Sequence, residues 1–378
     1  MIVRKPPMGW NSWNTFASNI NEQLIFDTAD RMVADGYLDA GYEYLVIDDC
    51  WSLRERGEDG RIIPDPEKFP HGMKAVADYV HSKGLKFGMY SCCGSLTCAG
   101  YPASYEHEFL DAQTFAEWGV DFLKYDNCYK PTEENDPKLY RRMGMALANC
   151  GRDILFSACN WGADESHKWI KETGAHMWRS TGDIVDNWAS VKSLIDQQAH
   201  MYQYNGQGCF NDMDMLIVGM FGKGNVGLGG CTLEEYRTHF SFWSLYGSPL
   251  MMGCDLRTVS DECRAMLLNK EVIAIDQDEA YRQPFYLSVM HCDGELVIGR
   301  LLEGGDIAIG FFNLTDDKRG MSHLTIADLG INHASGKALA LRDVWKHEDV
   351  GTYDTIFRTP ELEPHQCLLY RGKLVDRK

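Results

Sequence analysis

Residues 120–128 read Val-Asp-Phe-Leu-Lys-Tyr-Asp-Asn-Cys, a short apolar run that passes directly into polar residues. An apolar run of this length is typical of a buried strand. The same change from apolar to polar residues follows Tyr44–Ile47 and Ile154–Phe156. Between such runs, apolar residues recur with helical spacing, as in 21–38, where Asn21 is a candidate N-cap. The chain therefore alternates between strands and helices.

Regular alternation of this kind predicts right-handed crossovers and a parallel sheet. Eight units over about 275 residues match the size of a TIM barrel. A doubly wound open sheet is the alternative, but no GxGxxG motif follows the first strand, which disfavours dinucleotide binding. The eight strands are expected near Gly9, Leu45, Phe87, Phe122, Leu155, Trp178, Phe210 and Leu250.

After about Gln277 the pattern changes to short β-prone runs separated by turns rich in Gly, Asp and Asn. Leu296–Gly299 and Ile307–Phe312 are examples. This pattern predicts an antiparallel β-sandwich of roughly 95 residues. We therefore expect an α/β chain, with a (β/α)8 TIM barrel in residues 1–280 and a C-terminal antiparallel β-sandwich domain in residues 281–378.

The composition excludes several classes of partner. A net charge of -18 disfavours nucleic acid and acidic membrane surfaces but is compatible with a neutral substrate. No apolar run is long enough to span a membrane, and Met1–Trp10 lacks an apolar signal core, so we expect a cytoplasmic protein. The 13 cysteines are spread along the chain without paired CxxC motifs. Most are expected to be buried, reduced thiols.

Polar side chains follow nearly every expected strand, and the carboxyl ends of barrel strands carry the functional groups. One Asp at a strand end means little, because Asp is common in turns and caps. Carboxylates at most strand ends, interleaved with Trp and Tyr, predict a sugar pocket, in which aromatic faces pack on C–H surfaces and carboxylates accept hydroxyl hydrogen bonds. The residues at these ends include Trp13, Asp48, Asp49, Tyr90, Lys124, Asp126, Asn160, Arg179, Asp183, Asp214, Met215 and Asp255.

Glycoside hydrolysis needs two carboxyl groups, one that attacks the anomeric carbon and one that protonates the leaving oxygen. Asp126 is the candidate nucleophile, and Lys124, on the same strand face, is expected to hold the pKa of Asp126 down. Asp183 is the candidate acid, which needs a raised pKa. Arg179 is expected to bind substrate hydroxyls, because a stable pair with Asp183 would depress the pKa of the acid.

Several segments, taken in order, resemble glycoside hydrolase family 27, the α-galactosidase family. The resemblance covers most of residues 1–276 and implies a retaining double displacement, with Asp126 as nucleophile and Asp183 as acid/base. The matching segments are Pro7–Trp13, Ile47–Trp51, Gly88–Ser91, Thr97–Pro102, Asp111–Phe115, Lys124–Cys128, Trp178–Arg179 with Asp183, and Asn211–Met215.

The resemblance also implies a set of substrate-binding residues and a substrate with a terminal α-linked galactose. Asp48 and Asp49 would hold the axial 4-hydroxyl and the 6-hydroxyl, which selects galactose over glucose. No metal or other cofactor is expected, because two carboxylates suffice. Family members are monomers, dimers or tetramers, so a homo-oligomer is possible. The implied substrate-binding residues are Trp13, Asp48, Asp49, Tyr90, Cys98, Lys124, Asn160, Arg179, Asp214 and Met215.

Some features leave alternatives open. Cys159–Asp164 resembles the loop that reads the 2-position of the sugar: Asn160 favours a 2-hydroxyl, whereas the small Ala163 leaves an α-N-acetylgalactosaminidase possible. Cys98 and Cys128 match a pair that is disulfide-bonded in secreted members, and here the pair is either oxidised or reduced. The adjacent Cys92 and Cys93 depart from the family pattern, and either line the pocket or pack.

The sequence disfavours three other functions. A β-L-arabinopyranosidase is disfavoured because the Asp48–Asp49 pair expects a 6-hydroxyl. A catalytically silent sugar-binding protein is disfavoured because both candidate carboxylates are present. A metal-dependent barrel enzyme would need ligand clusters at strand ends, and three histidines fall away from the expected strand ends: His107, His167 and His176.

Overall fold

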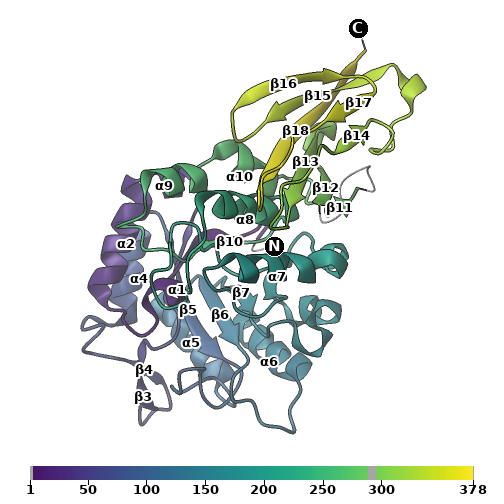
Figure 1. Cartoon of the computed structure of the whole chain (residues 1–378). Helices are drawn as coiled ribbons and strands as arrows, with labels where there is room; N and C mark the ends of the chain where they lie inside the picture. The colour runs from purple at the N-terminus through teal and green to yellow at the C-terminus, as the bar shows by residue number, and fades with distance from the viewer. Residues whose placement is uncertain (1–2, 288–294, 378) are drawn as a thin grey trace.

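The computed structural model describes residues 3–287 and 295–377 of the 378-residue chain. Residues 1 and 378, which bound the two expected domains, lie outside these ranges. Figure 1 shows a large N-terminal unit in which helices surround a sheet, and a smaller unit of strands at the C-terminal end. The larger unit carries the candidate site.

Eight strands form one parallel sheet in the order β10-β1-β2-β5-β6-β7-β8-β9. A parallel bridge between Leu216 and Met252 closes the ring, because Leu216 N–H donates to the Met251 carbonyl oxygen at 2.7 Å. The strand order follows the chain around the ring, so the barrel prediction is confirmed and the open doubly wound sheet is excluded. The strands are β1 (Met8–Asn11), β2 (Tyr44–Val46), β5 (Lys86–Cys92), β6 (Phe122–Asp126), β7 (Leu155–Ala158), β8 (Met177–Arg179), β9 (Phe210–Asp212) and β10 (Leu250–Met252).

Helices pack against the outer face of this sheet (Figure 1). Asn21 caps α2, as predicted, and accepts a hydrogen bond from Leu24 N–H at 2.9 Å. The helix expected over 21–38 ends earlier, at Ala34, because Gly36 adopts a left-handed φ of 83° that breaks it. The helices are α1 (Trp13–Phe16), α2 (Glu22–Ala34), α3 (Tyr37–Ala40), α4 (Gly72–Ser82), α5 (Glu108–Trp118), α6 (Asp136–Ala148), α7 (Trp188–Gln197), α8 (Leu233–Tyr246), α9 (Asp261–Leu267) and α10 (Lys270–Asp276). A hairpin of β3 (Ser52–Arg56) and β4 (Ile62–Pro64) extends from the barrel.

Strand residues alternate between two cores, as the period of two requires. On β6, Leu123 and Tyr125 belong to the core under the helices, whereas Phe122 belongs to the core inside the barrel. Lys124 and Asp126 have the same parity as Phe122 and therefore face the barrel interior. This confirms that Lys124 and Asp126 share a strand face.

The C-terminal unit is an antiparallel β-sandwich, as predicted. A six-stranded sheet, in the order β11-β12-β13-β18-β15-β16, and a β14–β17 pair enclose a core that includes Ile309, Phe311, Leu324 and Phe357. The strands are β11 (Phe285–Tyr286), β12 (Glu295–Leu301), β13 (Ile307–Asn313), β14 (His323–Thr325), β15 (Lys337–Asp343), β16 (Glu348–Tyr353), β17 (Ile356–Arg358) and β18 (Cys367–Asp376).

The two units are joined through α8, which packs against β12, β13 and β18. The rings of Phe242 and Phe312 meet at 5.4 Å between centroids. The guanidinium of Arg300 donates to the carbonyl oxygens of Ser244 and Ile275 at 3.3 and 3.1 Å. Both apolar and polar contacts thus hold the sandwich against α8, on the outside of the barrel.

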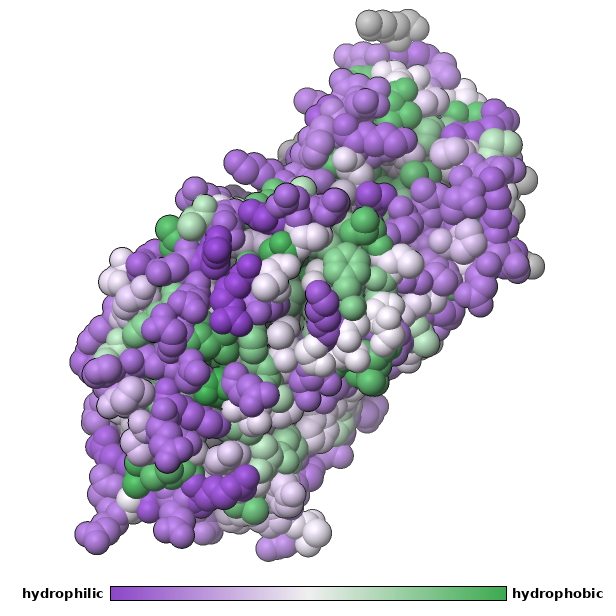
Figure 2. Space-filling view, turned by 60° about the vertical axis from the view of Figure 1, so that its left-hand side comes forward, coloured by the Kyte–Doolittle hydropathy of each residue, from purple (hydrophilic) through white to green (hydrophobic). Residues whose placement is uncertain are grey.

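The surface in Figure 2 is mainly hydrophilic, and apolar residues gather on it in small groups. In the part of the chain that the structure describes, every helix is too short or too polar to cross a bilayer. Ten cysteines in the same ranges are free, and all ten are buried, as expected from their sequence setting. Cys292 lies outside the described residues.

Candidate active site

A pocket opens at the carboxyl ends of the barrel strands. Eleven of the twelve site residues predicted from the sequence line it; Asn160 is the exception. Three further residues, Asn14, Trp161 and Val226, complete the wall. The predicted residues in the lining are Trp13, Asp48, Asp49, Tyr90, Cys98, Lys124, Asp126, Arg179, Asp183, Asp214 and Met215.

A larger groove lies at the opposite end of the barrel, where β6, β7 and β8 begin. Asp121, Ile154 and His176, each beside the start of one of these strands, contribute to its wall. The Arg152 guanidinium donates to Asp121, so that pair is already neutralised. Active sites of TIM barrels lie at the other face. We therefore place the chemistry in the pocket at the carboxyl ends.

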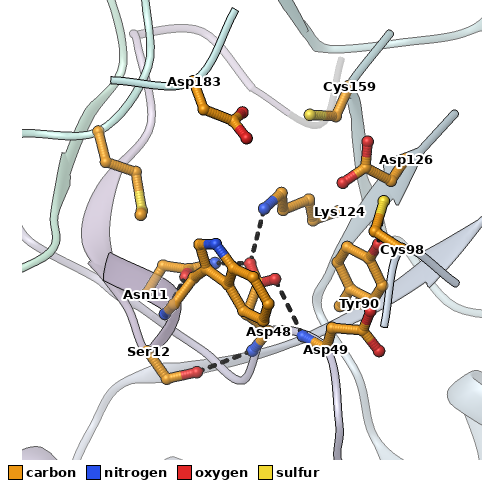
Figure 3. Close-up of polar contacts among 12 residues, drawn as sticks. Asn11, Ser12, Asp48, Asp49, Tyr90, Cys98, Lys124, Asp126, Cys159 and Asp183 are labelled. Atoms are coloured by element: carbon orange, nitrogen blue, oxygen red, sulfur yellow. Dashed lines mark hydrogen bonds and ion pairs between the residues drawn. The ribbon is translucent and has the colours of Figure 1, made fainter. Parts of the chain in front are cut away.

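The floor of the pocket is built around Asp48, which follows β2 (Figure 3). Its Oδ2 accepts hydrogen bonds from Lys124 Nζ and from Asn11 Nδ2, both at 2.7 Å. The adjacent Asp49 accepts from the backbone N–H of Cys50 at 2.7 Å and of Ala99 at 2.9 Å. These donors hold two neighbouring carboxylates in fixed orientations, as recognition of two adjacent hydroxyls requires.

Asp126 and Asp183 both point into the space above Lys124, from different strand ends (Figure 3). Asp126 is 6% exposed, and its Oδ1 accepts from Asn127 N–H at 3.0 Å. The side chain of Asp183 is 70% exposed and lies at the mouth of the pocket. The site thus offers one carboxyl group at depth and one beside solvent.

The electrostatics of Asp126 differ from the expectation. Burial raises its pKa to about 6, although the nearby ammonium of Lys124 lowers it in part. The close ion pair of Lys124 is with Asp48, so Lys124 lowers the pKa of Asp126 by less than burial raises it. The prediction that Lys124 keeps the pKa of this carboxyl low is therefore wrong in its net direction.

The pairing of Asp183 also differs from the expectation. Arg179 Nη2 donates to Asp183 Oδ1 at 2.8 Å, and Arg179 Nη1 donates to Asp214 Oδ1 at 2.7 Å. Partial desolvation by the surrounding pocket acts to raise the pKa of Asp183, but the charge and hydrogen bond of Arg179 outweigh this effect and lower the pKa overall. Arg179 does pair with the candidate acid, which corrects both the raised pKa and the free guanidinium predicted from the sequence.

Asp214 organises this side of the pocket from a left-handed backbone conformation, with φ of 83°. Its Oδ2 accepts from Ile184 N–H at 2.6 Å, directly after Asp183 in the chain. Trp243 Nε1 donates to its carbonyl oxygen at 2.7 Å. Burial raises the pKa of Asp214. The contacts tie the loop that carries Asp183 to the barrel.

The cysteines near the pocket have distinct roles. Cys98 and Cys128 form a disulfide, and Tyr90 Oη donates to Cys98 Sγ at 3.3 Å. Cys92 and Cys93 are fully buried and do not line the pocket, so the packing alternative holds for them. The sulfurs of Cys98 and Cys128 lie near Asp126, but their disulfide removes both thiolates that a metal would need.

Asn160 does not face the pocket. It is fully buried, and its Nδ2 donates to Asp136 Oδ2 and to the Ala163 carbonyl oxygen, both at 3.0 Å. The assignment of Asn160 to the 2-position of a sugar is therefore corrected, because its donor group is committed elsewhere. The residue after it, Trp161, lines the pocket instead.

A glycine-rich loop, residues 222–231, brings Val226 to the pocket, and sequence reasoning missed it. Asp186, fully buried, accepts from Gly222 N–H at 2.6 Å, from Cys231 N–H at 3.1 Å and from Tyr236 Oη at 2.9 Å. Both stems of the loop are thereby clamped. The glycines at 222, 224, 227, 229 and 230 indicate a tight loop, but nothing in the sequence shows that this loop lies beside the pocket.

A (β/α)8 barrel with paired carboxyl groups in a polar pocket at its carboxyl-terminal face, followed by a β-sandwich, defines a glycosidase. Residues 5–278 match the family model described as alpha galactosidase A, and residues 295–371 match the alpha galactosidase C-terminal beta sandwich domain. The chain belongs to the α-galactosidase family, glycoside hydrolase family 27.

Relatives with this family's activity in their names are similar over most of the chain. An alpha-galactosidase A of Cellvibrio japonicus is 46% identical over 84% of this chain and 78% of its own length. Alpha-galactosidase 3 of Arabidopsis thaliana is 42% identical over 98% of this chain and 82% of its own. An α-galactosidase of Saccharomyces cerevisiae, solved with raffinose, is 29% identical, with a TM-score of 0.88 over 98% of both chains.

Proposed function

We propose that the protein is a retaining α-galactosidase that removes terminal α-linked galactose from small molecules or oligosaccharides. The observation that carries this proposal is the fixed Asp48–Asp49 pair on the floor, below the carboxyl groups of Asp126 and Asp183. Two adjacent, oriented acceptors suit the axial 4-hydroxyl and the 6-hydroxyl of galactose. The yeast α-galactosidase solved with raffinose supports an α-galactosyl sugar as substrate.

The chemistry follows from the placement of the two carboxyl groups. Asp126 attacks the anomeric carbon and forms a covalent glycosyl-enzyme, while Asp183 gives its proton to the leaving oxygen. Water then attacks with Asp183 acting as base, which releases galactose and restores Asp126. With a pKa of about 6, the carboxyl group of Asp126 is mostly ionised at neutral pH.

Arg179 links substrate binding to the state of the acid. In the free protein its guanidinium donates to Asp183. Sugar hydroxyls that accept from this guanidinium compete with Asp183 for its N–H groups. The pKa of Asp183 then rises towards that of a proton donor, because the stabilising hydrogen bond is lost.

Features of the pocket also distinguish galactose from the alternative sugars. A β-L-arabinopyranoside lacks the 6-hydroxyl that the Asp48–Asp49 pair expects. An α-N-acetylgalactosaminide would need space near Ala163, which does not line the pocket. A silent sugar-binding protein would not need Asp126 and Asp183 in one pocket. Cytoplasmic location and homo-oligomerisation stay predictions.

The proposal is tested with matched nitrophenyl glycosides of α-galactose, α-N-acetylgalactosamine, β-L-arabinopyranose and α-glucose, with Asp126→Asn beside the wild type. The α-galactoside should be cleaved best, and proton NMR should show α-galactose as the first product. Asp126→Asn should lower turnover by more than about a thousandfold. Wild-type preference for another sugar, or β-galactose as the first product, would contradict the proposal.

A further inference from the structure

Two adjacent cysteines at the end of β5 lie against the chain that follows Asp126. Cys92 is the last residue of β5 and pairs with Asp126 in the register of the sheet. The backbone N–H of Cys93 donates to the Asp126 carbonyl oxygen at 2.9 Å. Both thiols are fully buried and lie outside the lining of the pocket. They can therefore affect the reaction only through the residues that they contact.

Cys92 contacts the backbone of the turn after Asp126. The N–H of Cys128 donates to Cys92 Sγ at 3.0 Å, and the Cys92 thiol donates to the Cys128 carbonyl oxygen at 3.2 Å. A Cβ at Gly94 would lie 2.1 Å from the same carbonyl oxygen. The turn is therefore packed tightly against the end of β5 and the two residues that follow it.

Cys93 contacts the side chain of Asn127. Its thiol donates to Asn127 Oδ1 at 3.1 Å, and Asn127 Nδ2 donates to Asp136 Oδ2 at 2.9 Å. Asp136 also pairs with Lys130, and a carboxylate can only accept, so the amide oxygen of Asn127 must face Cys93. Contact with Cys92 and burial raise the pKa of the Cys93 thiol, which therefore keeps the proton that it donates. Both ends of the Asn127 amide are thus held.

Asn127 in turn contacts the candidate nucleophile through its backbone. Its N–H donates to Asp126 Oδ1 at 3.0 Å. A hydrogen bond to one oxygen fixes the orientation of the carboxyl group, and attack needs the other oxygen in line with the anomeric carbon. Burial raises the pKa of Asp126, and the same hydrogen bond is one of the contacts that limit the rise to about 6.

We propose that Cys93 and Asp136 are positioning residues for the nucleophile: they hold the amide of Asn127, and the N–H of Asn127 orients Asp126 for attack. This role rests on the proposed function, in which Asp126 attacks the anomeric carbon. The Cys92–Cys93 pair, which departs from the family pattern, then supports the reaction from outside the pocket.

The test measures kcat/KM for α-galactosyl fluoride, because its leaving group needs little protonation and the first step then depends mainly on Asp126. Cys93→Ala removes the donor to Asn127 and should lower kcat/KM about tenfold. Cys93→Ser keeps a donor at this position and should stay within about twofold of wild type. Equal losses in the two variants would overturn the proposal, because they would point to lost packing.

The pH profile is a readout that lost packing alone would not move. With the fluoride, kcat/KM should fall as the pH drops below about 6, because only the ionised carboxyl group of Asp126 attacks. A weaker hydrogen bond from Asn127 N–H raises the pKa of Asp126. In Cys93→Ala this acidic limb should therefore move to higher pH by about half a pH unit. A limb at the wild-type position would overturn the proposal.

A double-mutant cycle shows whether Cys93 acts through Asn127. Asn127→Ala removes both amide contacts but keeps the backbone N–H, and it should lower kcat/KM at least as much as Cys93→Ala. Adding Cys93→Ala to Asn127→Ala should then change kcat/KM by less than about twofold. Losses that multiply would show that Cys93 acts without Asn127, which would overturn the proposal.

Cys150→Ala is the matched control. Cys150 is also a buried thiol, and it donates to the Leu147 carbonyl oxygen at 3.1 Å. It lies before the amino end of β7 and does not line the pocket. Both kcat/KM and the acidic limb should match the wild type. The same loss and shift in Cys150→Ala would contradict the role of Cys93.

The wild type separates this proposal from the proposed function. If the wild type fails to hydrolyse α-galactosyl fluoride, the proposed function is wrong and the role of Cys93 fails with it. If the wild type hydrolyses the fluoride and Cys93→Ala does so equally well, the proposed function stands and only the positioning role is overturned.

Discussion

Arg179 Nη2 lies 2.8 Å from Asp183 Oδ1, so the candidate acid is held in an ion pair in the free protein. The same guanidinium reaches Asp214 at 2.7 Å. The pair lowers the pKa of Asp183 although partial desolvation acts against it, while burial raises the pKa of Asp126 to about 6. The free protein thus holds the shared proton mainly on Asp126, opposite to the form that reacts.

This relationship predicts an acidic pH optimum. Between the lowered pKa of Asp183 and the pKa of about 6 for Asp126, the pair carries one proton, as a nucleophile and an acid together require. Above pH about 6 that proton is lost, so kcat/KM should decline as the pH rises. Below the pKa of Asp183 both groups are protonated, and kcat/KM should decline again. The measurement is kcat/KM against pH on an alkyl α-galactoside, because its leaving oxygen needs the proton.

A basic limb well above pH 7 would contradict this prediction, since it would mean that Asp183 is not paired with Arg179 in the working enzyme. The profile of kcat serves as the control, because it reports the enzyme with substrate bound. There the basic limb should move to higher pH if substrate hydroxyls displace Asp183 from Arg179.

The two carboxyl groups should respond differently to the leaving group. Asp183→Asn should lower kcat by about 10²–10⁴ with an alkyl galactoside, because the leaving oxygen needs a proton. With a dinitrophenyl galactoside the loss in the first step should be small. Asp126→Asn should be inactive with both substrates. The measurement is kcat/KM with the two leaving groups, which reports the first step, and equal losses of kcat/KM in Asp183→Asn would contradict its role as acid.

Asn160→Ala should act on stability rather than on galactose recognition. Removal of its amide deprives the buried Asp136 of one donor, which should lower the free energy of unfolding by about 1–3 kcal/mol. The KM for α-galactosyl fluoride should stay within about twofold of wild type. Denaturant unfolding and fluoride hydrolysis provide the two measurements. Asn149→Ala, at an exposed helix end, is the control and should lose less. A large rise in KM would restore Asn160 as a sugar-binding residue.

Asp186→Asn should loosen the glycine-rich loop 222–231. The carboxylate accepts from both stems of the loop, and an amide at this position faces N–H donors with its own N–H group. We expect a loss of about 2–3 kcal/mol in the free energy of unfolding and a raised KM, since Val226 lines the pocket. Thermal unfolding and steady-state kinetics test this. The control is Asp196→Asn, because Asp196 is an exposed partner of Lys192; this change should alter the free energy of unfolding by no more than about 0.5 kcal/mol. If Asp186→Asn has no larger effect than this control, Asp186 does not hold the loop in place.

Reduction of Cys98–Cys128 should destabilise the protein and weaken substrate binding. The bond closes a loop with a sequence separation of 30, for which about 3–4 kcal/mol is expected. The loop also supplies the Ala99 N–H that orients Asp49. Melting temperature and KM with and without a phosphine reductant are the measurements. A variant with serine at both positions should match the reduced protein, and any further response to reductant would place the effect at another cysteine.

The fold was accessible from the sequence because its signals are local. The apolar run at 120–123, and its counterparts, mark strands by length and composition alone, and the intervening period of 3.6 marks helices. Apolar spacing does not determine where a helix ends. The helix α2 ends at Ala34, four residues before the apolar pattern does, because Gly36 adopts a left-handed conformation.

The sequence by itself determined the barrel, the sandwich and eleven residues of the pocket. Side chains at the carboxyl ends of parallel strands must meet at one face, so order along the chain already placed Asp48, Asp126 and Asp183 together. Tertiary structure alone decided which groups pair there. Three features depend on contacts across the barrel. Arg179 pairs with Asp183, Asn160 donates to Asp136, and Val226 lines the pocket. The directions of the pKa shifts also depend on burial, which is a property of the packed molecule and not of neighbouring residues in the chain.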